Sequence, residues 1–491
     1  MSRRSLIWLV MLAALLVPVD RAAAQRATRA PVRRAPVRRS PAKSAKPTEP
    51  PPNIVIFLGD DLGIGETGPW GQTELATPNI DQLARDGMKL TEVRSSAAVC
   101  GPARCSLMTG FHNGHCRLDD NDIDYLRTDD VTLAKRLKAK GYATGLFGKW
   151  GLSWESRPES WPNAQGFDAF FGYRDQLHAH NYYPEYLLSN TDSVKTGNVV
   201  ATRGPMGTGR ATVRVAYAPD LISAKAYQFI RAHAKQPFFL YWATTLPHIN
   251  NEGARGYDDG GYETTDLGPY ADTPWPTAKK SYAAQVRRLD QDLGHLRRLL
   301  DSLGIAKKTL ILFLSDNGAT MLKGVDDGTT AFIGRWFNGT LNYRGFKGDL
   351  YDGGLRVPGI AVWPGKVKPG SSSAVRADFS DVHATVLEAA GIPALKNTDG
   401  RSLLPALTNK GPVKSRDYFV WFSPDRNQSA VLMGGWKGVW MSDTLRVFNV
   451  TADPGETKDL ASLEPDVVRR LTEIRDREDQ RAPHPQPPTK P

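Results

Sequence analysis

Five short apolar runs, separated by segments with helical periodicity, constrain the fold of this chain more than any other feature. The runs cover residues 54–58, 143–147, 238–242, 310–314 and 360–363, and each has the length and composition of a buried parallel strand. Between them, apolar residues recur every three or four positions from Val286 to Leu303, and a shorter helical pattern runs from Asp130 to Gly141. This alternation predicts an α/β fold in which helices cover both faces of a large, mostly parallel sheet.

The first 24 residues have the pattern of a signal peptide. Arg3 and Arg4 precede an apolar run over residues 6–19, and Ala22-Ala23-Ala24 offers a small-residue cleavage site. A run of this length is too short to span a bilayer comfortably, so no transmembrane anchor is expected after cleavage. We therefore expect an exported protein, either periplasmic or secreted.

Both ends of the mature chain are predicted to be disordered. Residues 25–52 consist largely of Arg, Lys, Pro and Ala, with almost nothing to bury, and residues 481–491 form a second Pro-rich tail. The N-terminal segments carry most of the net charge of +11, so the basic character says nothing about the folded domain. No nucleic-acid partner is expected.

The residues between these ends are predicted to form a large domain over residues 53–407 and a subdomain over residues 408–480. In the second part the pattern changes to short aromatic strands at residues 418–422, 430–433, 436–440 and 445–448. A helix from Pro465 follows, with Val468, Leu471 and Ile474 facing inward. We expect a small antiparallel sheet packed on this helix.

Two pairs of polar side chains directly follow two of the predicted strands. Asp60 and Asp61 come after the first strand, and Asp316 and Asn317 come after the strand at residues 310–314. Ligands of such sheets gather beyond the carboxyl ends of the strands. An all-oxygen set suits a hard divalent cation such as Ca²⁺ or Mg²⁺ and argues against Zn²⁺. The alternative for either pair alone is ordinary turn chemistry.

A cysteine stands at the start of a predicted helix. Cys100 opens the sequence Cys-Gly-Pro-Ala-Arg, which ends at Arg104, and Thr109-Gly110 closes the helix. On the residues alone, an Arg one turn after the Cys is an activated-thiol arrangement. A buried structural Cys is the alternative.

The Cys-x-Pro-x-Arg pattern resembles the signature of the type I sulfatases, and further motifs of that family follow in the family's order. These are Gly-Lys-Trp at Lys149, Pro-His at His248, Ser-Asp-Asn-Gly at Asp316, Gly-Gly-Leu-Arg-Val-Pro shortly after Lys347, Asp-Gly-Arg-Ser-Leu-Leu-Pro from Asp399 and Asp-Pro-Gly-Glu-Thr from Asp453. The resemblance extends from Asn53 to about Leu460. It implies an alkaline-phosphatase-like architecture for the predicted α/β domain.

The resemblance also implies an activity and a set of site residues. Cys100 would be oxidised to formylglycine by a maturation enzyme, and the hydrate of that aldehyde would be the nucleophile in the hydrolysis of sulfate monoesters. One Ca²⁺ ion would be bound by Asp60, Asp61, residue 100, Asp316 and Asn317. The sulfate pocket would be lined by Arg104, Lys149, His248 and Lys347.

The charge that develops during sulfate ester hydrolysis also explains why cationic groups would be needed at the site. A sulfate ester gains negative charge on its bridging oxygen in the transition state, so Lys149, Lys347 and a metal ion would stabilise that state. His248 is placed to protonate the leaving alkoxide. The alternatives are a solvated surface Lys and an ordinary loop His.

Gly151 stands where many members of the family have a His, two residues after the Lys of Gly-Lys-Trp. The chain resembles a branch acting on galactose or N-acetylgalactosamine sulfates, with Gly at this place and a later segment from His178 to Pro184. His180 is a candidate substitute for the missing His or a sugar contact, with a plain loop His as the alternative. Tyr182 and Tyr183 would stack on a sugar ring, so a sulfated carbohydrate is the expected substrate.

The sequence leaves the roles of four residues near the Cys motif open. Cys105 and Cys116 form a disulfide in an exported protein or remain as two buried thiols, and their spacing does not decide between these outcomes. His112 and His115, which follow the Cys helix, are further candidates for substrate contact.

Two other functions fit this kind of fold. A phosphatase or phosphodiesterase would carry a Thr or Ser nucleophile and several His and Asp zinc ligands, which the chain does not show at the corresponding places. A non-catalytic protein that binds sulfated glycans is the other alternative, and the intact Cys motif at Cys100 argues against it.

Overall fold

The computed structural model describes residues 50–121, 124–202, 204–253, 257–320, 336–411 and 415–479. The predicted signal peptide, nearly all of the predicted linker and the C-terminal tail lie outside these residues. Within the described ranges, no helix is both long enough and apolar enough to cross a membrane.

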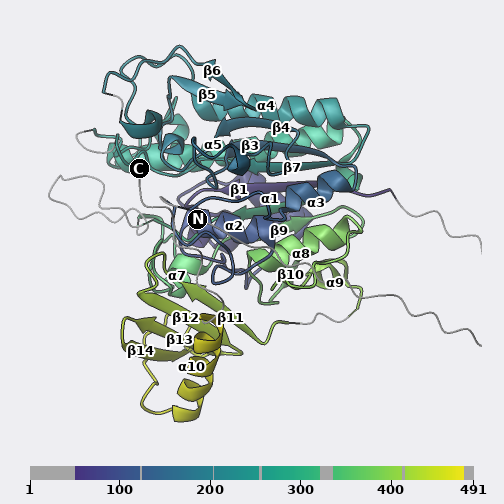
Figure 1. The fold of residues 1–491 in the computed structure, drawn as a ribbon. Coiled ribbons are helices and arrows are strands. Elements are labelled where there is room, and N and C mark those ends of the chain that lie inside the picture. The colour runs from purple at the N-terminus through teal and green to yellow at the C-terminus, as the bar shows by residue number, and fades with distance from the viewer. Residues whose placement is uncertain are drawn as a thin grey trace, which may run out of the picture. The chain divides into compact units, whose positions relative to one another are not determined.

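A ten-stranded sheet forms the larger layer of the structure (Figure 1), in the order β10-β2-β9-β8-β1-β7-β3-β4-β5-β6. Its strands are β1 (Asn53–Gly59), β2 (Met88–Leu90), β3 (Ala143–Lys149), β4 (Ala169–Tyr173), β5 (Tyr186–Ser189), β6 (Asp192–Lys195), β7 (Phe238–Ala243), β8 (Thr309–Ser315), β9 (Gly359–Val362) and β10 (Ser371–Ser373). The strands β8, β1, β7 and β3 are parallel, as predicted, and β4, which was not predicted from the sequence, continues the parallel order. The prediction of a parallel strand at residues 360–363 was wrong, because β9 is antiparallel to both β8 and β2. An apolar run reports burial on both faces and carries no information on strand direction.

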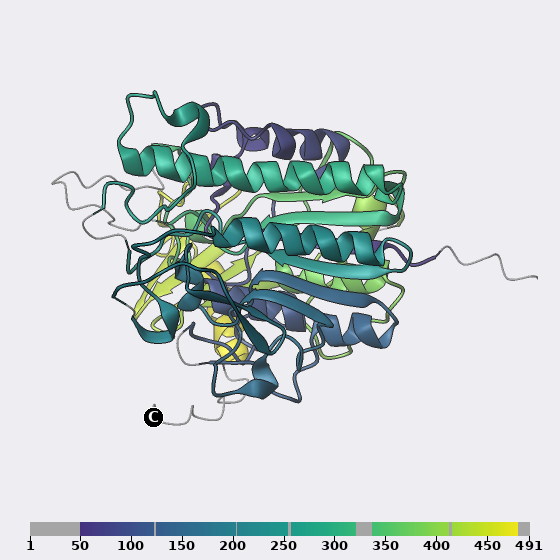
Figure 2. The ribbon, with the colours of Figure 1, turned by 90° about the horizontal axis from the view of Figure 1, so that it is seen from above.

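Helices cover both faces of this sheet, and alternate residues of β1 show the arrangement. Val55 and Phe57 pack in one core with α1, α4 and α5, whereas Ile54, Ile56 and Leu58 pack in another with α2, α3, α8 and α9. The bounds are α1 (Pro78–Asp86), α2 (Cys100–Thr109), α3 (Leu133–Ala139), α4 (Ala218–His233), α5 (Thr277–Ser302), α8 (Phe379–Ala389) and α9 (Leu404–Thr408). Figure 2 shows α1, α5 and α4 lying over one face. Successive strand side chains point to opposite faces, so a continuous apolar run needs cover on both.

The carboxyl ends of four adjacent strands meet at one edge of the sheet. Gly59 at the end of β1 is level with Ser315 at the end of β8, and Ala243 of β7 is level with Gly148 of β3. The segments that follow these strands therefore begin side by side. Polar residues that are far apart in the sequence are brought together there.

A four-stranded antiparallel sheet follows in the chain, as predicted, in the order β11-β12-β13-β14. Its strands are β11 (Tyr418–Phe422), β12 (Gln428–Met433), β13 (Trp436–Met441) and β14 (Thr444–Asn449). One face packs beside α7 (Asp352–Leu355), and the indole N–H of Trp421 donates to the Ser95 carbonyl at 2.9 Å. The other face is covered by α10 (Pro465–Asp479) through Leu471 and Ile474 (Figure 1). Both sheets belong to one compact unit that begins at Pro50.

Candidate active site

The two predicted pairs of polar residues meet at the carboxyl edge of the large sheet. The Asn317 amide donates to Asp61 Oδ1 at 2.7 Å, and the Asp61 backbone N–H donates to Asp316 Oδ1 at 3.1 Å. Asp61 has a φ of +68°, a left-handed conformation that is uncommon for a residue other than Gly. Such a conformation persists where surrounding contacts hold it, and it is concentrated at functional sites.

Two oxygens of this cluster are buried without a hydrogen bond from any described residue. They are Asn317 Oδ1 and Asp60 Oδ2, and the second lies 2.9 Å from Lys149 Nζ without the alignment of a hydrogen bond. Asp60 Oδ2 already lies against the cations Lys149 and Arg104, whereas Asn317 Oδ1 has no such neighbour among the described residues. A buried oxygen left without a partner is costly, and a metal ion would satisfy it. Because the donors are carboxylate and amide oxygens, the cluster fits a hard divalent cation such as Ca²⁺.

Three cationic side chains lie among these acids. The Arg104 guanidinium lies 2.9 Å from Asp316 and 3.4 Å from Asp60, and Lys347 Nζ lies 2.7 Å from Asp61 Oδ1. Burial alone would raise the pKa of Asp60, but Lys149 and other nearby cations hold it well below its ordinary value. Burial and the neighbouring Asp60 raise the pKa of Asp316 to about 6.

Lys347 reaches the site from a segment remote from the strand ends. Its backbone N–H donates to the Ala319 carbonyl at 2.9 Å, which anchors it beside the residues that follow β8. Its ammonium lies 3.1 Å from His248 Nε2, and His248 Nδ1 lies 2.6 Å from the Ile249 carbonyl. Burial and the adjacent Lys347 lower the pKa of His248 to about 3. His248 thus accepts from Lys347 as a neutral imidazole.

Cys100 is buried at the first position of α2, with its Sγ 3.5 Å from Asp60 Oδ1. Burial and the Asp316 carboxylate raise the pKa of the Cys100 thiol. The interpretation of an activated thiol was therefore wrong, because Arg104 contacts Asp316 and the Lys149 carbonyl rather than the sulfur. The unmodified thiol is a poor nucleophile here.

A cavity of about 750 Å³ opens over this cluster. Cys100, His180, His248 and Lys347 all line it, so the structure brings these four predicted residues together. Arg104 and Lys149 are buried among the acids, and neither is among the residues that line the cavity. Pro424, which follows β11, also lines it, so the small sheet contributes to the wall.

Gln176 occupies the space beside Gly151. Its side-chain amide donates to the Gly151 carbonyl at 2.9 Å, and a Cβ at position 151 would lie 2.5 Å from Gln176 Nε2. Gly151 also has a φ of +72°, which disfavours any side chain there. Gln176 lines the cavity and thus stands near the place of the missing His.

Sequence reasoning missed Gln176 and five other polar residues of the cavity wall, namely Asp120, Asn121, Asn251, Glu252 and Thr320. Gln176 lies two residues before the singled-out segment from His178, which was the available signal. Asn251 and Glu252 lie just beyond His248, in a loop with no recognisable pattern.

The prediction that Tyr182 and Tyr183 stack on a sugar was wrong. Both side chains are buried in the core with α4 and α5, and the Tyr182 hydroxyl donates to the carbonyls of Thr245 and His248. An aromatic pair next to candidate ligands is as compatible with core packing as with sugar binding, and here both side chains pack in the core.

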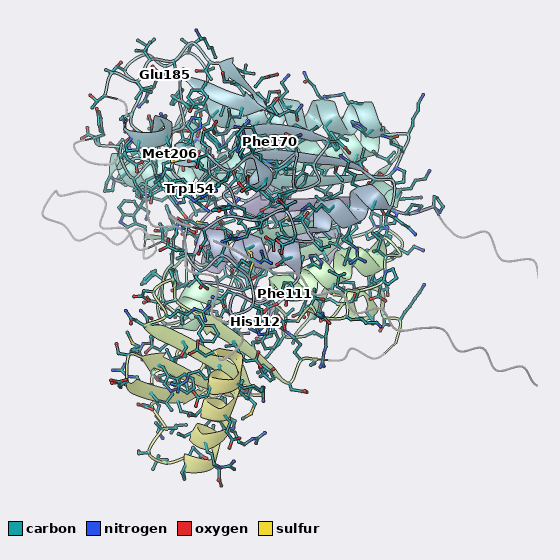
Figure 3. The ribbon with its side chains drawn as sticks, viewed as in Figure 1. Phe111, His112, Trp154, Phe170, Glu185 and Met206 are labelled. Atoms are coloured by element: carbon teal, nitrogen blue, oxygen red, sulfur yellow. A yellow bond between two sulfur atoms is a disulfide. The ribbon has the colours of Figure 1, made fainter. Side chains whose placement is uncertain are left out.

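His112 and His115 do not line the cavity. His115 Nδ1 lies 2.8 Å from Asp399, and His112 Nε2 lies 3.3 Å from Glu478 of α10, so the pair connects the loop after α2 to the C-terminal helix (His112 is labelled in Figure 3). Cys105 and Cys116, for which two outcomes were open, form a disulfide.

Comparisons with known proteins identify relatives over most of the chain. A family model described as Sulfatase matches residues 52–392. The N-acetylgalactosamine-6-sulfatase of Mus musculus is 30% identical over 422 residues, covering 79% of this chain and 71% of the relative. The N-acetylgalactosamine-6-O-sulfatase of Bacteroides thetaiotaomicron is 28% identical over 500 residues, covering 86% and 92%.

Solved structures share the fold. One from a study of glycosaminoglycan metabolism by Bacteroides thetaiotaomicron has a TM-score of 0.70 at 25% identity, covering 88% of this chain and 100% of that one. Another, solved in complex with a neocarrahexaose, has a TM-score of 0.71 at 24% identity, covering 89% and 95%. The large sheet with its helices and the small antiparallel sheet are thus an arrangement that known structures share.

Proposed function

Since this chain belongs to the sulfatase family and is a sulfuric ester hydrolase, we propose that it hydrolyses sulfate monoesters of a sulfated sugar with a formylglycine made from Cys100. The observation that carries the proposal is the position of Cys100. It lies at the start of α2, beside Asp60 and on the wall of the cavity. A nucleophile at this position would meet a substrate that enters the cavity beside Lys347.

Modification of Cys100 supplies what the thiol lacks. With its pKa raised by burial and Asp316, the thiol is not a thiolate near neutral pH. The hydrated aldehyde of a formylglycine would supply a hydroxyl nucleophile and a second hydroxyl through which sulfate can leave. A formylglycine-generating maturation enzyme is therefore a required partner.

A single Ca²⁺ ion is proposed at the oxygen cluster, held by Asp60, Asp61, Asp316, Asn317 and residue 100. The donor chemistry and the unsatisfied oxygen of Asn317 support it. Such an ion would polarise the sulfate oxygens. Arg104, Lys149 and Lys347 orient the acids and add positive charge around the reacting group.

A sulfated galactose or N-acetylgalactosamine is the proposed substrate class. Two of the relatives described above are named for N-acetylgalactosamine-6-sulfate. The cavity wall also presents amide side chains of Asn121, Gln176 and Asn251, which can bind sugar hydroxyls.

Export to the periplasm or the medium is part of the proposal, on the strength of the predicted signal peptide over residues 1–24. The disulfide between Cys105 and Cys116 is compatible with an oxidising compartment. Fractionation of cells that express the full chain, with N-terminal sequencing of the product, tests this point.

The test of function is a substrate panel assayed with protein co-expressed with a maturation enzyme. We expect release of sulfate from N-acetylgalactosamine 6-sulfate or galactose 6-sulfate in preference to choline sulfate. Peptide mass spectrometry should show conversion of Cys100 in the same sample. Full activity with only the thiol present would contradict the formylglycine, and activity restored by Zn²⁺ alone after chelation would favour a phosphatase.

A further inference from the structure

Two amide side chains lie over the residue that follows Cys100. A Cβ at Gly101 would lie 2.6 Å from Asn121 Oδ1 and 3.4 Å from Gln176 Nε2, so both amides pack directly against the backbone of Gly101. Asn121, Gln176 and Cys100 all line the cavity. The two amides therefore form a part of the cavity wall beside the proposed nucleophile.

One end of each amide is held by the backbone, and these bonds fix which end is the oxygen and which is the nitrogen. The Gly101 N–H donates to Asn121 at 2.7 Å, and Gln176 donates to the Gly151 carbonyl at 2.9 Å. A backbone N–H can only donate and a carbonyl can only accept, so the bonded atoms are Asn121 Oδ1 and Gln176 Nε2. Val99, which precedes α2, supplies no side-chain cap, so Asn121 satisfies this N–H of the first turn from a remote loop.

The other end of each amide remains available. Asn121 Nδ2 and Gln176 Oε1 have no hydrogen-bond partner among the described residues, and neither belongs to the buried polar atoms left without one. Both atoms are therefore open to solvent, which these two residues meet in the cavity. The wall beside Cys100 thus presents a donor from Asn121 and an acceptor from Gln176.

A hydroxyl group matches this pair, because a single hydroxyl oxygen both accepts and donates a hydrogen bond. It would accept from Asn121 Nδ2 and donate to Gln176 Oε1. A sulfate oxygen only accepts, so at the same place it would face the Gln176 carbonyl oxygen without a hydrogen between them. The pair therefore favours a hydroxyl of the substrate over a second sulfate group.

We propose that Asn121 Nδ2 and Gln176 Oε1 together bind one free hydroxyl of the sugar, close to the carbon that bears the sulfate. This inference rests on the proposed sulfatase function and names a group that the same site recognises besides the sulfate. The hydroxyl lies close to the sulfated carbon because Gly101 adjoins the residue whose oxygen would attack sulfur. In a hexose 6-sulfate the nearest ring hydroxyl is the one on C4, because C5 carries the ring oxygen.

Removal of that hydroxyl from the substrate is the direct test. N-acetylgalactosamine 6-sulfate and its 4-deoxy analogue are compared with protein co-expressed with a maturation enzyme. We expect the wild type to prefer the first substrate by about ten- to a hundredfold in kcat/KM, because the analogue makes neither of two hydrogen bonds. This preference is a ratio between two substrates with the same sulfate, so a general effect of a substitution on the site cancels from it.

Two substitutions each remove one of the two hydrogen bonds. Asn121→Asp replaces the available donor with an oxygen and keeps an acceptor for the Gly101 N–H, so the bond to α2 is retained. Gln176→Met removes the available acceptor and keeps the length of the side chain. Each should lower the preference for N-acetylgalactosamine 6-sulfate over the 4-deoxy analogue by roughly three- to tenfold. A residue that only positions α2 would lower kcat/KM for both substrates and leave the preference unchanged.

Gln82→Met and Asn397→Asp are the matched controls. Gln82 lies on α1 and donates to Asp86, Asn397 is exposed, and neither lines the cavity. Both should keep the wild-type preference. A wild type that hydrolyses the two sugars equally well, or Asn121→Asp and Gln176→Met variants with the wild-type preference, would overturn the inference while leaving the sulfatase function intact. A wild-type enzyme that hydrolyses neither sugar sulfate, although Cys100 is modified, would overturn the proposed function and this inference with it.

Discussion

Two largely buried clusters of this protein each combine three acids with three cations. They differ in whether their central carboxylate is already bonded to all of the cations around it. The cluster that we propose to be catalytic, called the catalytic cluster below, combines three acids, Asp60, Asp61 and Asp316, with the cations Arg104, Lys149 and Lys347. A second cluster, here called the seam cluster, combines Glu92, Asp352 and Glu456 with Arg94, Arg356 and Lys437. It joins the region of α7 to β13 of the small sheet, so it connects the two sheets.

In the seam cluster the central carboxylate is saturated. Asp352 accepts hydrogen bonds from Arg94, from Arg356 at 3.0 Å and from Lys437 at 2.8 Å. These cations hold the pKa of Asp352 well below its ordinary value despite burial. In the catalytic cluster Asp316 has its pKa raised to about 6 by burial and Asp60. A carboxylate crowded by a second acid, as Asp316 is, still has a place for a cation, whereas a carboxylate already bonded to three cations, as Asp352 is, stabilises the fold.

Cys100→Ala should have the largest effect on activity of all the substitutions proposed, and it acts at the catalytic cluster. We expect a loss of turnover of at least about 10⁴-fold, because the proposed nucleophile is removed. The thermal midpoint should stay close to that of the wild type, since a small buried thiol is replaced by a methyl group. Sulfate release and a thermal melt on the same preparation measure both. Substantial residual turnover would place the nucleophile elsewhere.

Asp316→Asn tests the catalytic cluster while keeping its shape. We expect kcat/KM to fall by roughly a thousandfold, equivalent to about 4 kcal/mol, because a ligand charge is lost from the proposed cation site. Stability should change little, because the substitution removes a carboxylate that burial and Asp60 already disfavour. Calcium affinity, measured by titration calorimetry after chelation, should fall in parallel. Unchanged affinity would contradict the assigned ligand.

Asp352→Asn is the matched change in the seam cluster and should have the opposite profile. We expect a loss of about 3 kcal/mol of unfolding free energy, since three buried cations lose the charge that pairs them. The turnover of the molecules that remain folded should be close to normal, because Asp352 does not line the cavity. Chemical denaturation with a parallel activity assay distinguishes the two profiles. A large loss of kcat without a loss of stability would show that the seam cluster acts on the site.

Much of the fold and the centre of the site could be predicted because both depend on local sequence. The apolar runs at β1 and β8 marked buried strands, and Asp60 and Asp316 directly follow them, so parallel pairing alone brings these residues together. The ordered motifs identified Cys100 for the same reason. The direction of β9 was predicted wrongly, because composition does not encode the sense of a pairing.

The motifs alone do not show which of their residues lie in the candidate site and which stabilise the fold. Arg356 and Glu456 lie in family-like motifs as recognisable as those of the site, yet both serve the seam cluster. Conversely, Glu252 lines the cavity from a loop without any pattern, and Gln176 lines it from just outside the segment that begins at His178. Such residues are defined by which loops meet in space, and this depends on tertiary packing rather than on neighbours in the sequence.

The smallest expected difference between the clusters is in how their contribution to the free energy of unfolding depends on pH. It is measured by comparing the wild type with Asp352→Asn and with Asp316→Asn. The folded pKa of Asp352 is depressed, so its contribution is complete above the unfolded value of about 3.9 and is lost as pH falls through the folded value. The free-energy difference between wild type and Asp352→Asn should therefore be constant from about pH 8 to pH 5 and shrink below about pH 4. The folded pKa of Asp316 is raised, so in calcium-free protein the wild type should lose stability relative to Asp316→Asn as pH rises from about 4 to about 6. Denaturant titrations at several pH values measure both differences, and two curves with the same sign would refute the contrast between a saturated and an open cluster.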